Sequence, residues 1–200
     1  MLGSITPLGE RGRQQRWGIT AFMHVLGSTF GGSAIGLSSG LLGLAFTRAT
    51  RISAGSPLRP SILAAFLIFG VAFELGLAGA RLPTVHRQVR QDSLTRYRGW
   101  VYGLGFGVQL GFGVVTVVTA SATYAMLVAG VLTSSVVGGA IIGATFGFVR
   151  GATLLAGGWV RRPHHLEELE AGLRLIAPRA RAVGVGAQAI LAGLLIAVSV

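Results

Sequence analysis

Cysteine is absent from this chain of 200 residues, and lysine is absent as well, so that all 17 basic residues are arginine. Without cysteine the chain can form no disulfide, no thiolate metal site and no thiol redox relay. Charged residues make up only 12% of the sequence, about half of the roughly 25% that a soluble domain carries. These absences exclude several classes of chemistry and favour a membrane environment.

Apolar residues dominate what is present, at 52% of the sequence with a mean hydropathy of +0.68. They form stretches near or above the length of about 20 residues that crosses a bilayer as a helix. We therefore predict a single all-α integral membrane domain, a bundle of about five transmembrane helices with the lipid bilayer as its main partner. The predicted spans are residues 18–46, 61–80, 99–127, 136–160 and 183–200.

Arginine lies unevenly between these spans. Residues 1–17, 81–98 and 161–182 together hold thirteen arginines, whereas the connections predicted on the opposite side hold three, all within residues 47–60. Because loops on the cytoplasmic side are enriched in basic residues, we predict a cytoplasmic N-terminus (residues 1–17) and an external C-terminus in the inner or plasma membrane. The net charge of +11 could also suggest nucleic acid. No basic face with interleaved aromatics supports that, so we expect no nucleic-acid partner.

Similar segments recur about 80 residues apart. Ala80-Arg81-Leu82-Pro83 is followed by Val160-Arg161-Arg162-Pro163, and Phe69-Gly70 by Phe146-Gly147. This pattern predicts a two-fold repeat of a helix pair in parallel orientation. Chance similarity is the competing explanation, because glycine and alanine are abundant.

Residues 163–177 have apolar side chains at helical spacing, namely Leu166, Leu169, Leu173 and Ile176. With Pro163 at the start and Pro178 at the end, the pattern predicts an amphipathic helix that stops at Pro178. We expect it to lie in the membrane interface on the cytoplasmic side. A plain cytoplasmic connector is the alternative.

Glycine makes up 32 residues, and much of it repeats every four positions within the predicted spans. Four-residue spacing places glycines on one helix face, where two backbones can approach closely. We predict that these glycines pack helix against helix. They are Gly32, Gly36 and Gly40 in the first span, Gly103, Gly107 and Gly111 in the third, and Gly139, Gly143, Gly147 and Gly151 in the fourth.

Each predicted span also carries one strongly polar side chain, about 10–17 Å from its cytoplasmic end at 1.5 Å per residue. Such groups are costly in lipid and normally face the bundle interior with a partner. We predict that they form a layer that binds a substrate or carries protons, or else fastens the helices together. The members are His24, Glu74, Gln109, Arg150 and Gln188, with Thr116 and Thr119 as possible lining.

Glu74 and Arg150 are the only full charges of this layer, and we predict that they form an ion pair. Such a pair can be purely structural, because removal of one partner leaves the other charge buried, or it can be part of a site. His24 could accept a proton or simply bond to a neighbouring helix.

Other candidate sites are weak. His164-His165 before Glu167-Glu168 offers two histidine–glutamate pairs, but no third ligand is evident nearby, so we predict no metal site. The sequence holds no P-loop, no His-Glu-x-x-His and no Gly-x-Ser-x-Gly motif. We expect no enzymatic activity, no catalytic residues and no cofactor.

The second half of the chain resembles the transmembrane region of DsbD/CcdA-type cytochrome c biogenesis proteins. The resemblance is carried by a glycine-rich span running into Gly113-Val114-Val115-Thr116-Val117-Val118-Thr119, then by Phe146-Gly147-Phe148-Val149-Arg150-Gly151. It implies a similar scaffold and a transport-like role. The chemistry of that family uses paired intramembrane cysteines, which this chain lacks.

Two functions remain open at this point. The first is a small multi-pass transporter, or a subunit of one, for an ion or a small polar solute, anionic solutes included, that passes the polar layer. The second is a non-catalytic structural or assembly subunit of a larger membrane complex. Association with copies of itself or with other membrane subunits would serve either function.

Overall fold

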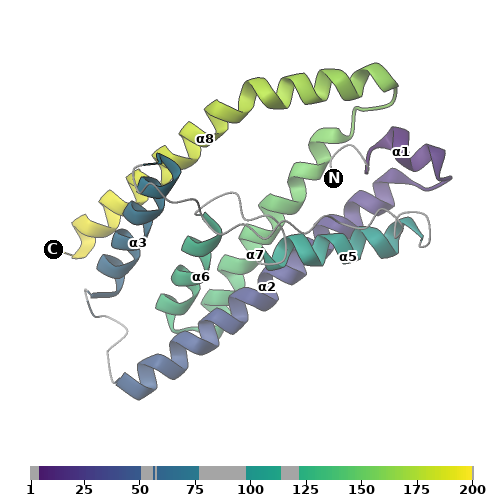
Figure 1. Ribbon diagram of the computed structural model, residues 1–200. Helices are drawn as coiled ribbons and strands as arrows, with labels where there is room; N and C mark the ends of the chain where they lie inside the picture. The colour runs from purple at the N-terminus through teal and green to yellow at the C-terminus, as the bar shows by residue number, and fades with distance from the viewer. Residues whose placement is uncertain (1–4, 51–55, 57, 77–97, 114–121, 200) are drawn as a thin grey trace.

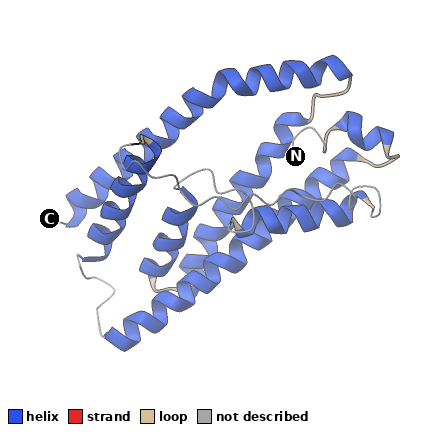
Figure 2. Cartoon of the chain, in the orientation of Figure 1, coloured by secondary structure: helices blue, strands red, loops and turns tan. Residues whose placement is uncertain are grey.

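The computed structural model describes residues 5–50, 56, 58–76, 98–113 and 122–199. Within these ranges all regular secondary structure is helical (Figure 2). The elements are α1 (Pro7–Gly12), α2 (Trp17–Thr50), α3 (Leu58–Glu74), α5 (Gly99–Phe112), α6 (Ala122–Thr133), α7 (Val136–Ala152), the 3₁₀ turn η1 (Thr153–Gly157) and α8 (Pro163–Ser199).

The long helix α2 is the centre of the packing, with its most extensive contacts to α7 and α5 (Figure 1). Helix α5 runs in the same direction as α2, because Gly103 lies against Thr20 while Gly111, two turns further on, lies against Ser28. Helix α7 runs the opposite way, since Gly147 lies against Ser28 and the earlier Gly139 against Gly36. Helix α2 is therefore packed against two neighbours of opposite direction.

Glycine sets the distance between these helices. A Cβ atom added to Gly143 would lie 2.0 Å from the carbonyl oxygen of Gly32, and one added to Gly111 would lie 2.1 Å from that of Ser28. Real Cβ atoms do not come this close to a backbone, so alanine at either position would force the helices apart. The four-residue glycine series of both α5 and α7 are directed at α2.

Helices α6 and α7 form a short hairpin. Ser134 takes a left-handed conformation (φ 49°) between them, and the hydroxyl of Ser135 caps α7 by accepting a hydrogen bond from the Gly138 amide at 3.1 Å. Serine at the N-cap satisfies one of the free amides of the first turn. Helix α6 thus extends to Thr133, beyond the predicted end of the third span at residue 127.

The predicted third span, residues 99–127, does not form a single continuous helix. Helix α5 ends at Phe112, where Gly113 takes the left-handed conformation (φ 65°) typical of a glycine that ends a helix, and α6 begins only at Ala122. We call the place where α5 ends at Gly113 the helix break.

Helix α6 nevertheless continues in the direction of α5. Gly130 packs against Ser39, and Gly43 packs against Val131, so α6 follows α2 toward the end where α2 stops. Together α5 and α6 run alongside α2 as two half-helices. Their path is that of the predicted third span, but the helix itself is discontinuous.

The prediction that Pro178 ends a helix is also wrong. Helix α8 runs unbroken from Pro163 to Ser199, 37 residues with Pro178 inside, or about 55 Å at 1.5 Å per residue. The segment 163–177 and the predicted fifth span are therefore parts of one helix, which is visibly curved (Figure 1). An internal proline removes one backbone hydrogen bond and bends a helix, and the exposed first half of α8 leaves room for that bend.

Helix α3 packs against α8 and α6. Ala64 and Leu67 of α3 meet Ala192 of α8 in a small apolar cluster. Helix α3 begins before the predicted residue 61 and ends at Glu74. The rest of the predicted span, residues 77–80, lies outside the described residues, as does the repeated segment around Arg81.

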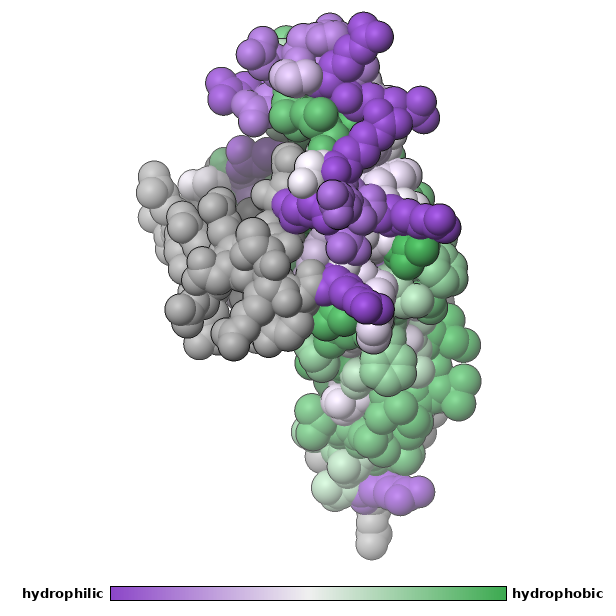
Figure 3. All heavy atoms as spheres, turned by 90° about the vertical axis from the view of Figure 1, so that its right-hand side faces the viewer, coloured by the Kyte–Doolittle hydropathy of each residue, from purple (hydrophilic) through white to green (hydrophobic). Residues whose placement is uncertain are grey.

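Three described helices are long and apolar enough to cross a membrane: Trp17–Ala49, Val136–Gly157 and Pro163–Ala197. Figure 3 views the molecule from the end where α1 and the start of α8 lie, and hydrophilic side chains gather over much of that face. Helices α3, α5 and α6 are shorter than these three helices, so the count of five spans stays a prediction. The internal repeat also stays a prediction.

Candidate functional site

The side chain of Arg150, on α7, lies at the helix break. Its Nη1 donates a hydrogen bond to the hydroxyl of Thr123, in the first turn of α6, at 3.3 Å. The same nitrogen lies 3.7 Å from the position that a Cβ on Gly113 would take. The guanidinium also lies over the ring of Phe146, 5.6 Å from its centroid. Arg150 thus reaches across to both half-helices.

The end of α5 is electrostatically suited to a cation. The last carbonyl groups of a helix carry a partial negative charge, and α5 ends at Gly113, beside the guanidinium. The face of Phe146 adds a weaker attraction for a cation. Arg150 is half-buried at this place, so the site combines a permanent positive charge with a polar and irregular backbone inside the helical bundle.

The predicted ion pair between Glu74 and Arg150 is not formed. Among the described residues the structure contains one ion pair, between Arg13 and Glu10. Glu74 is the last residue of α3, which packs on α8 and α6, whereas Arg150 belongs to α7 in the α2 assembly. The two charges therefore belong to different parts of the bundle.

The other members of the predicted polar layer also lie in different parts of the bundle. His24 lies in α2 beside α5, and Gln188 lies half-buried in α8. Gln109 is exposed on α5. Thr116 and Thr119 lie outside the described residues. Of the predicted layer, the structure brings His24 and Arg150 into the α2, α5 and α7 assembly.

His24 is buried, with 4% of its surface exposed, and its Nδ1 atom has no hydrogen-bond partner among the described residues. The backbone carbonyl of His24 lies against Gly107, which places the residue at the contact between α2 and α5. A buried nitrogen without a partner is uncommon in folded proteins, because leaving it unbonded costs free energy. His24 is therefore a further polar group inside this assembly.

A buried carboxylate that the sequence did not single out lies at the arginine-rich end. Glu10 of α1 is completely buried and accepts hydrogen bonds from Thr20 at 2.8 Å, from Arg13 at 2.8 Å and from the hydroxyl of Tyr102. Burial lowers the pKa of the Arg13 guanidinium, but its hydrogen bond to Glu10 and the proximity of Tyr102 outweigh this and raise that pKa above the ordinary value. This cluster ties α1, α2 and α5 together.

Residues 1–17 were predicted only as a cytoplasmic segment rich in arginine. In the structure α1 folds back onto the bundle, where the Leu8 amide donates a hydrogen bond to the Val160 carbonyl at 3.1 Å. The sequence contains one signal that α1 could be anchored to the bundle: Glu10 is an isolated acid three residues before Arg13. Its partners Thr20 and Tyr102 could not be found without the tertiary fold.

A second polar network lies at the opposite end of α2. The guanidinium of Arg59 donates to the Thr47 hydroxyl at 2.7 Å and to the Leu132 carbonyl at 3.1 Å, and Thr47 shares a hydrogen bond of 2.6 Å with Ser134. These contacts join α3, α2 and the turn between α6 and α7. The network fastens this end of the bundle in the same way as the Glu10 cluster fastens the other.

Within the described ranges, no group of three histidine, aspartate or glutamate side chains is placed to hold a metal ion. His165 instead accepts a hydrogen bond from the Arg161 amide through Nδ1 at 3.2 Å.

The three long apolar helices and the exposed apolar side chains on them indicate a helical membrane protein. No known family, curated protein or solved structure matches the chain. Any more specific function has to be argued from the site itself.

Proposed function

We propose that the protein is a small membrane transporter, or a transporter subunit, that moves a small anionic solute past Arg150 at the helix break. The observation that carries the proposal is the position of this arginine, half-buried among helices and in contact with both half-helices. A charged side chain inside a membrane bundle is costly and usually marks an ion or solute pathway.

The helix break supports this role. In many transporters, substrate sites are built at discontinuous helices, because their free backbone groups can bind a solute inside the membrane. Here the first turn of α6 and the end of α5 are both next to one guanidinium. Arginine binds carboxylate and phosphate oxygens in a bidentate manner, which suits it to a small anion.

The buried His24 is a second group that such a pathway could use. It lies in the same α2, α5 and α7 assembly as Arg150, and its Nδ1 is available for a hydrogen bond. Imidazole is the side chain most often used to carry protons in proteins. We propose that His24 couples proton movement to the passage of the anion.

Flux through proteoliposomes tests the proposal. The full chain would be reconstituted and assayed with radiolabelled chloride, phosphate and acetate, while an enclosed pH dye reports proton movement. We expect Arg150→Gln to lower the flux of the transported anion at least tenfold and Arg150→Lys to retain part of it. Arg174→Gln, on the exposed first half of α8, is the matched control for charge and should transport normally.

Water access to the helix break is a separate test. Because the chain has no cysteine, a single Thr123→Cys variant can be probed with a small, membrane-impermeant thiol reagent. A transport pathway requires the thiol to react, and added substrate anion should slow the reaction. A folded variant whose thiol stays unreactive from both sides of the membrane would contradict the proposal.

A structural or assembly subunit is the second candidate. A Cβ added to Gly184, Gly186 or Gly193 of α8 would meet no atom within 4 Å, so α8 is open to a partner helix at these positions. By contrast, the glycine series of α5 and α7 are already occupied by α2 of the same chain. Absence of flux for all three anions, together with disruption of a detergent-stable oligomer by Gly186→Leu, would favour this second role.

A further inference from the structure

Four arginines surround two adjacent hollows at the end of the bundle where α2 and α5 begin. One hollow, of about 330 Å³, is lined by Arg11, Arg16 and Arg161 together with Gln15, Trp17, Pro7 and Gly158. The other, of about 310 Å³, is lined by Arg98 and Trp100 and shares Gln15 and Arg16 with the first. We call the first of these the arginine hollow.

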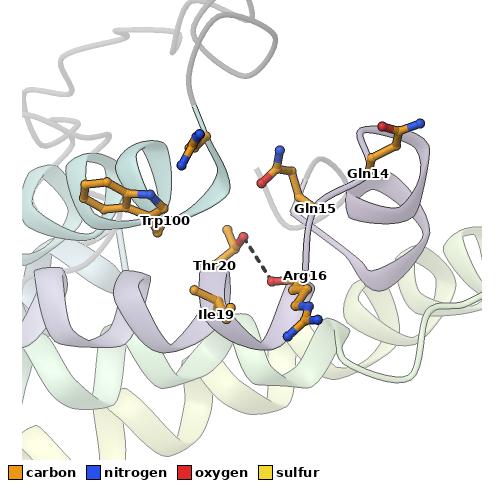
Figure 4. Close-up of a pocket in the computed structure, with 7 residues that line it drawn as sticks. Gln14, Gln15, Arg16, Ile19, Thr20 and Trp100 are labelled. Atoms are coloured by element: carbon orange, nitrogen blue, oxygen red, sulfur yellow. Dashed lines mark hydrogen bonds between the residues drawn. The ribbon is translucent and has the colours of Figure 1, made fainter.

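The three guanidinium groups of the arginine hollow come from separate parts of the chain. Arg11 belongs to α1, Arg16 directly precedes α2, and Arg161 lies between η1 and α8. The fold therefore brings Arg161 to the same hollow as Arg11 and Arg16, which lie close together near the start of the sequence. Figure 4 shows the neighbouring hollow, with Gln15 and Trp100 on opposite sides and the Arg16 side chain directed away from Trp100.

Within the part of the chain that the structure describes, none of the residues lining the arginine hollow is acidic. The nearby carboxylate of Glu10 is fully buried and is already engaged by Arg13, Thr20 and Tyr102. Among the described residues, no hydrogen bond or ion pair is recorded for the guanidinium groups of Arg11, Arg16 and Arg161, which are all exposed. Three uncompensated cations around one hollow favour an anion as occupant.

Tryptophan side chains line both hollows. Trp17 lines the arginine hollow, its indole nitrogen is buried without a hydrogen-bond partner among the described residues, and Trp100 lines the adjacent hollow. Trp159, the third and last tryptophan of the sequence, directly precedes Val160, which bonds to Leu8 of the same end. Tryptophan is enriched at membrane–water interfaces, where its ring sits among the headgroups.

From this geometry we propose that the arginine hollow binds the phosphate group of an anionic ligand, with a phospholipid headgroup as the source that the tryptophans favour. Arg11, Arg16 and Arg161 would hold the phosphate oxygens, since guanidinium groups bind phosphate through paired hydrogen bonds. The site is distinct from Arg150 and does not depend on the proposed transport.

A titration of the detergent-solubilised full chain tests this site. Short-chain phosphatidylglycerol, short-chain phosphatidylcholine and inorganic phosphate would each be added while tryptophan fluorescence and the melting temperature are recorded. We expect phosphatidylglycerol to bind and to raise the melting temperature. Each arginine near an anionic lipid contributes roughly fivefold to the affinity. The triple variant Arg11→Gln/Arg16→Gln/Arg161→Gln should therefore bind phosphatidylglycerol about a hundredfold more weakly.

The matched control is Arg174→Gln/Arg179→Gln/Arg181→Gln, which removes the same charge from exposed positions of α8 and should bind as the unchanged chain does. Should the triple variant prove poorly folded, Arg16→Gln alone is expected to weaken binding about fivefold. Equal binding of phosphatidylglycerol by the two triple variants would overturn the proposal, as would equal binding of both lipids by the unchanged chain. Binding of inorganic phosphate that is lost only in the arginine-hollow variant would support the site and identify a soluble phosphate as its source.

Discussion

The hydroxyl of Tyr102 donates a hydrogen bond to the carboxylate of Glu10, which lies 92 positions away in the sequence. Both side chains are buried, and the same carboxylate is held by Thr20 and Arg13. Through this contact the short helix α1 is fixed to the start of α5. The end of the bundle that carries the arginine hollow is therefore built around one buried acid.

Tyr102→Phe tests how much this contact stabilises the protein. The change leaves the ring in place but removes a donor to a buried charge, so we expect the free energy of unfolding to fall by about 1.5–3 kcal/mol. Thermal or denaturant unfolding in detergent would measure it. Tyr124→Phe is the control, because no hydrogen bond of the Tyr124 hydroxyl is recorded within the described residues. Equal stability of the two variants would show that the Glu10 cluster contributes little.

The contact between α2 and α7 predicts a sharp difference between glycines. Gly143→Ala would place a methyl group 2.0 Å from the Gly32 carbonyl oxygen. We therefore expect the free energy of unfolding to fall by about 1–3 kcal/mol. Gly193→Ala in α8 meets nothing within 4 Å and should be neutral, or stabilising by up to about 1 kcal/mol. Melting temperatures of the two variants check this. A tolerated Gly143→Ala would mean that α2 and α7 are further apart than described.

The network at the far end of α2 depends on the hydroxyl of Thr47. Thr47→Val removes the acceptor of the Arg59 hydrogen bond and the partner of Ser134, and we expect it to cost about 1–3 kcal/mol. Thr145→Val is the matched control, because the exposed Thr145 hydroxyl bonds only to the Ile141 carbonyl of its own helix. Unfolding of both variants side by side would reveal whether the network stabilises the bundle.

The continuity of α8 can be measured directly. Cysteines placed at Gly172 and Gly186, on either side of Pro178 and with open space around both, would carry spin labels in a chain that has no cysteine of its own. A continuous helix predicts one narrow distance distribution near 21 Å between the two backbones, shortened slightly by the bend. A broad distribution would instead indicate that Pro178 separates two independent helices.

The sequence was sufficient for conclusions that depend on composition and short-range periodicity. Long apolar runs with few charges indicated a helical membrane protein, and the helices at 17–50 and 136–152 lie close to two of the predicted spans. The four-residue spacing of glycine identified the faces of α5 and α7 that meet α2. Helical periodicity is a local property, so it can be read without knowing which helices are neighbours.

The tertiary structure decided what depends on contacts between distant segments. It separated Glu74 from Arg150, because α3 packs with α8 rather than with α7. It placed Arg150 at the helix break and buried Glu10 beneath Tyr102. It also kept α8 helical through Pro178, where local propensity alone predicts an end. Which distant residue becomes a contact partner, and whether a helix has room to bend, depend on how the helices pack. No local pattern of residues contains that information.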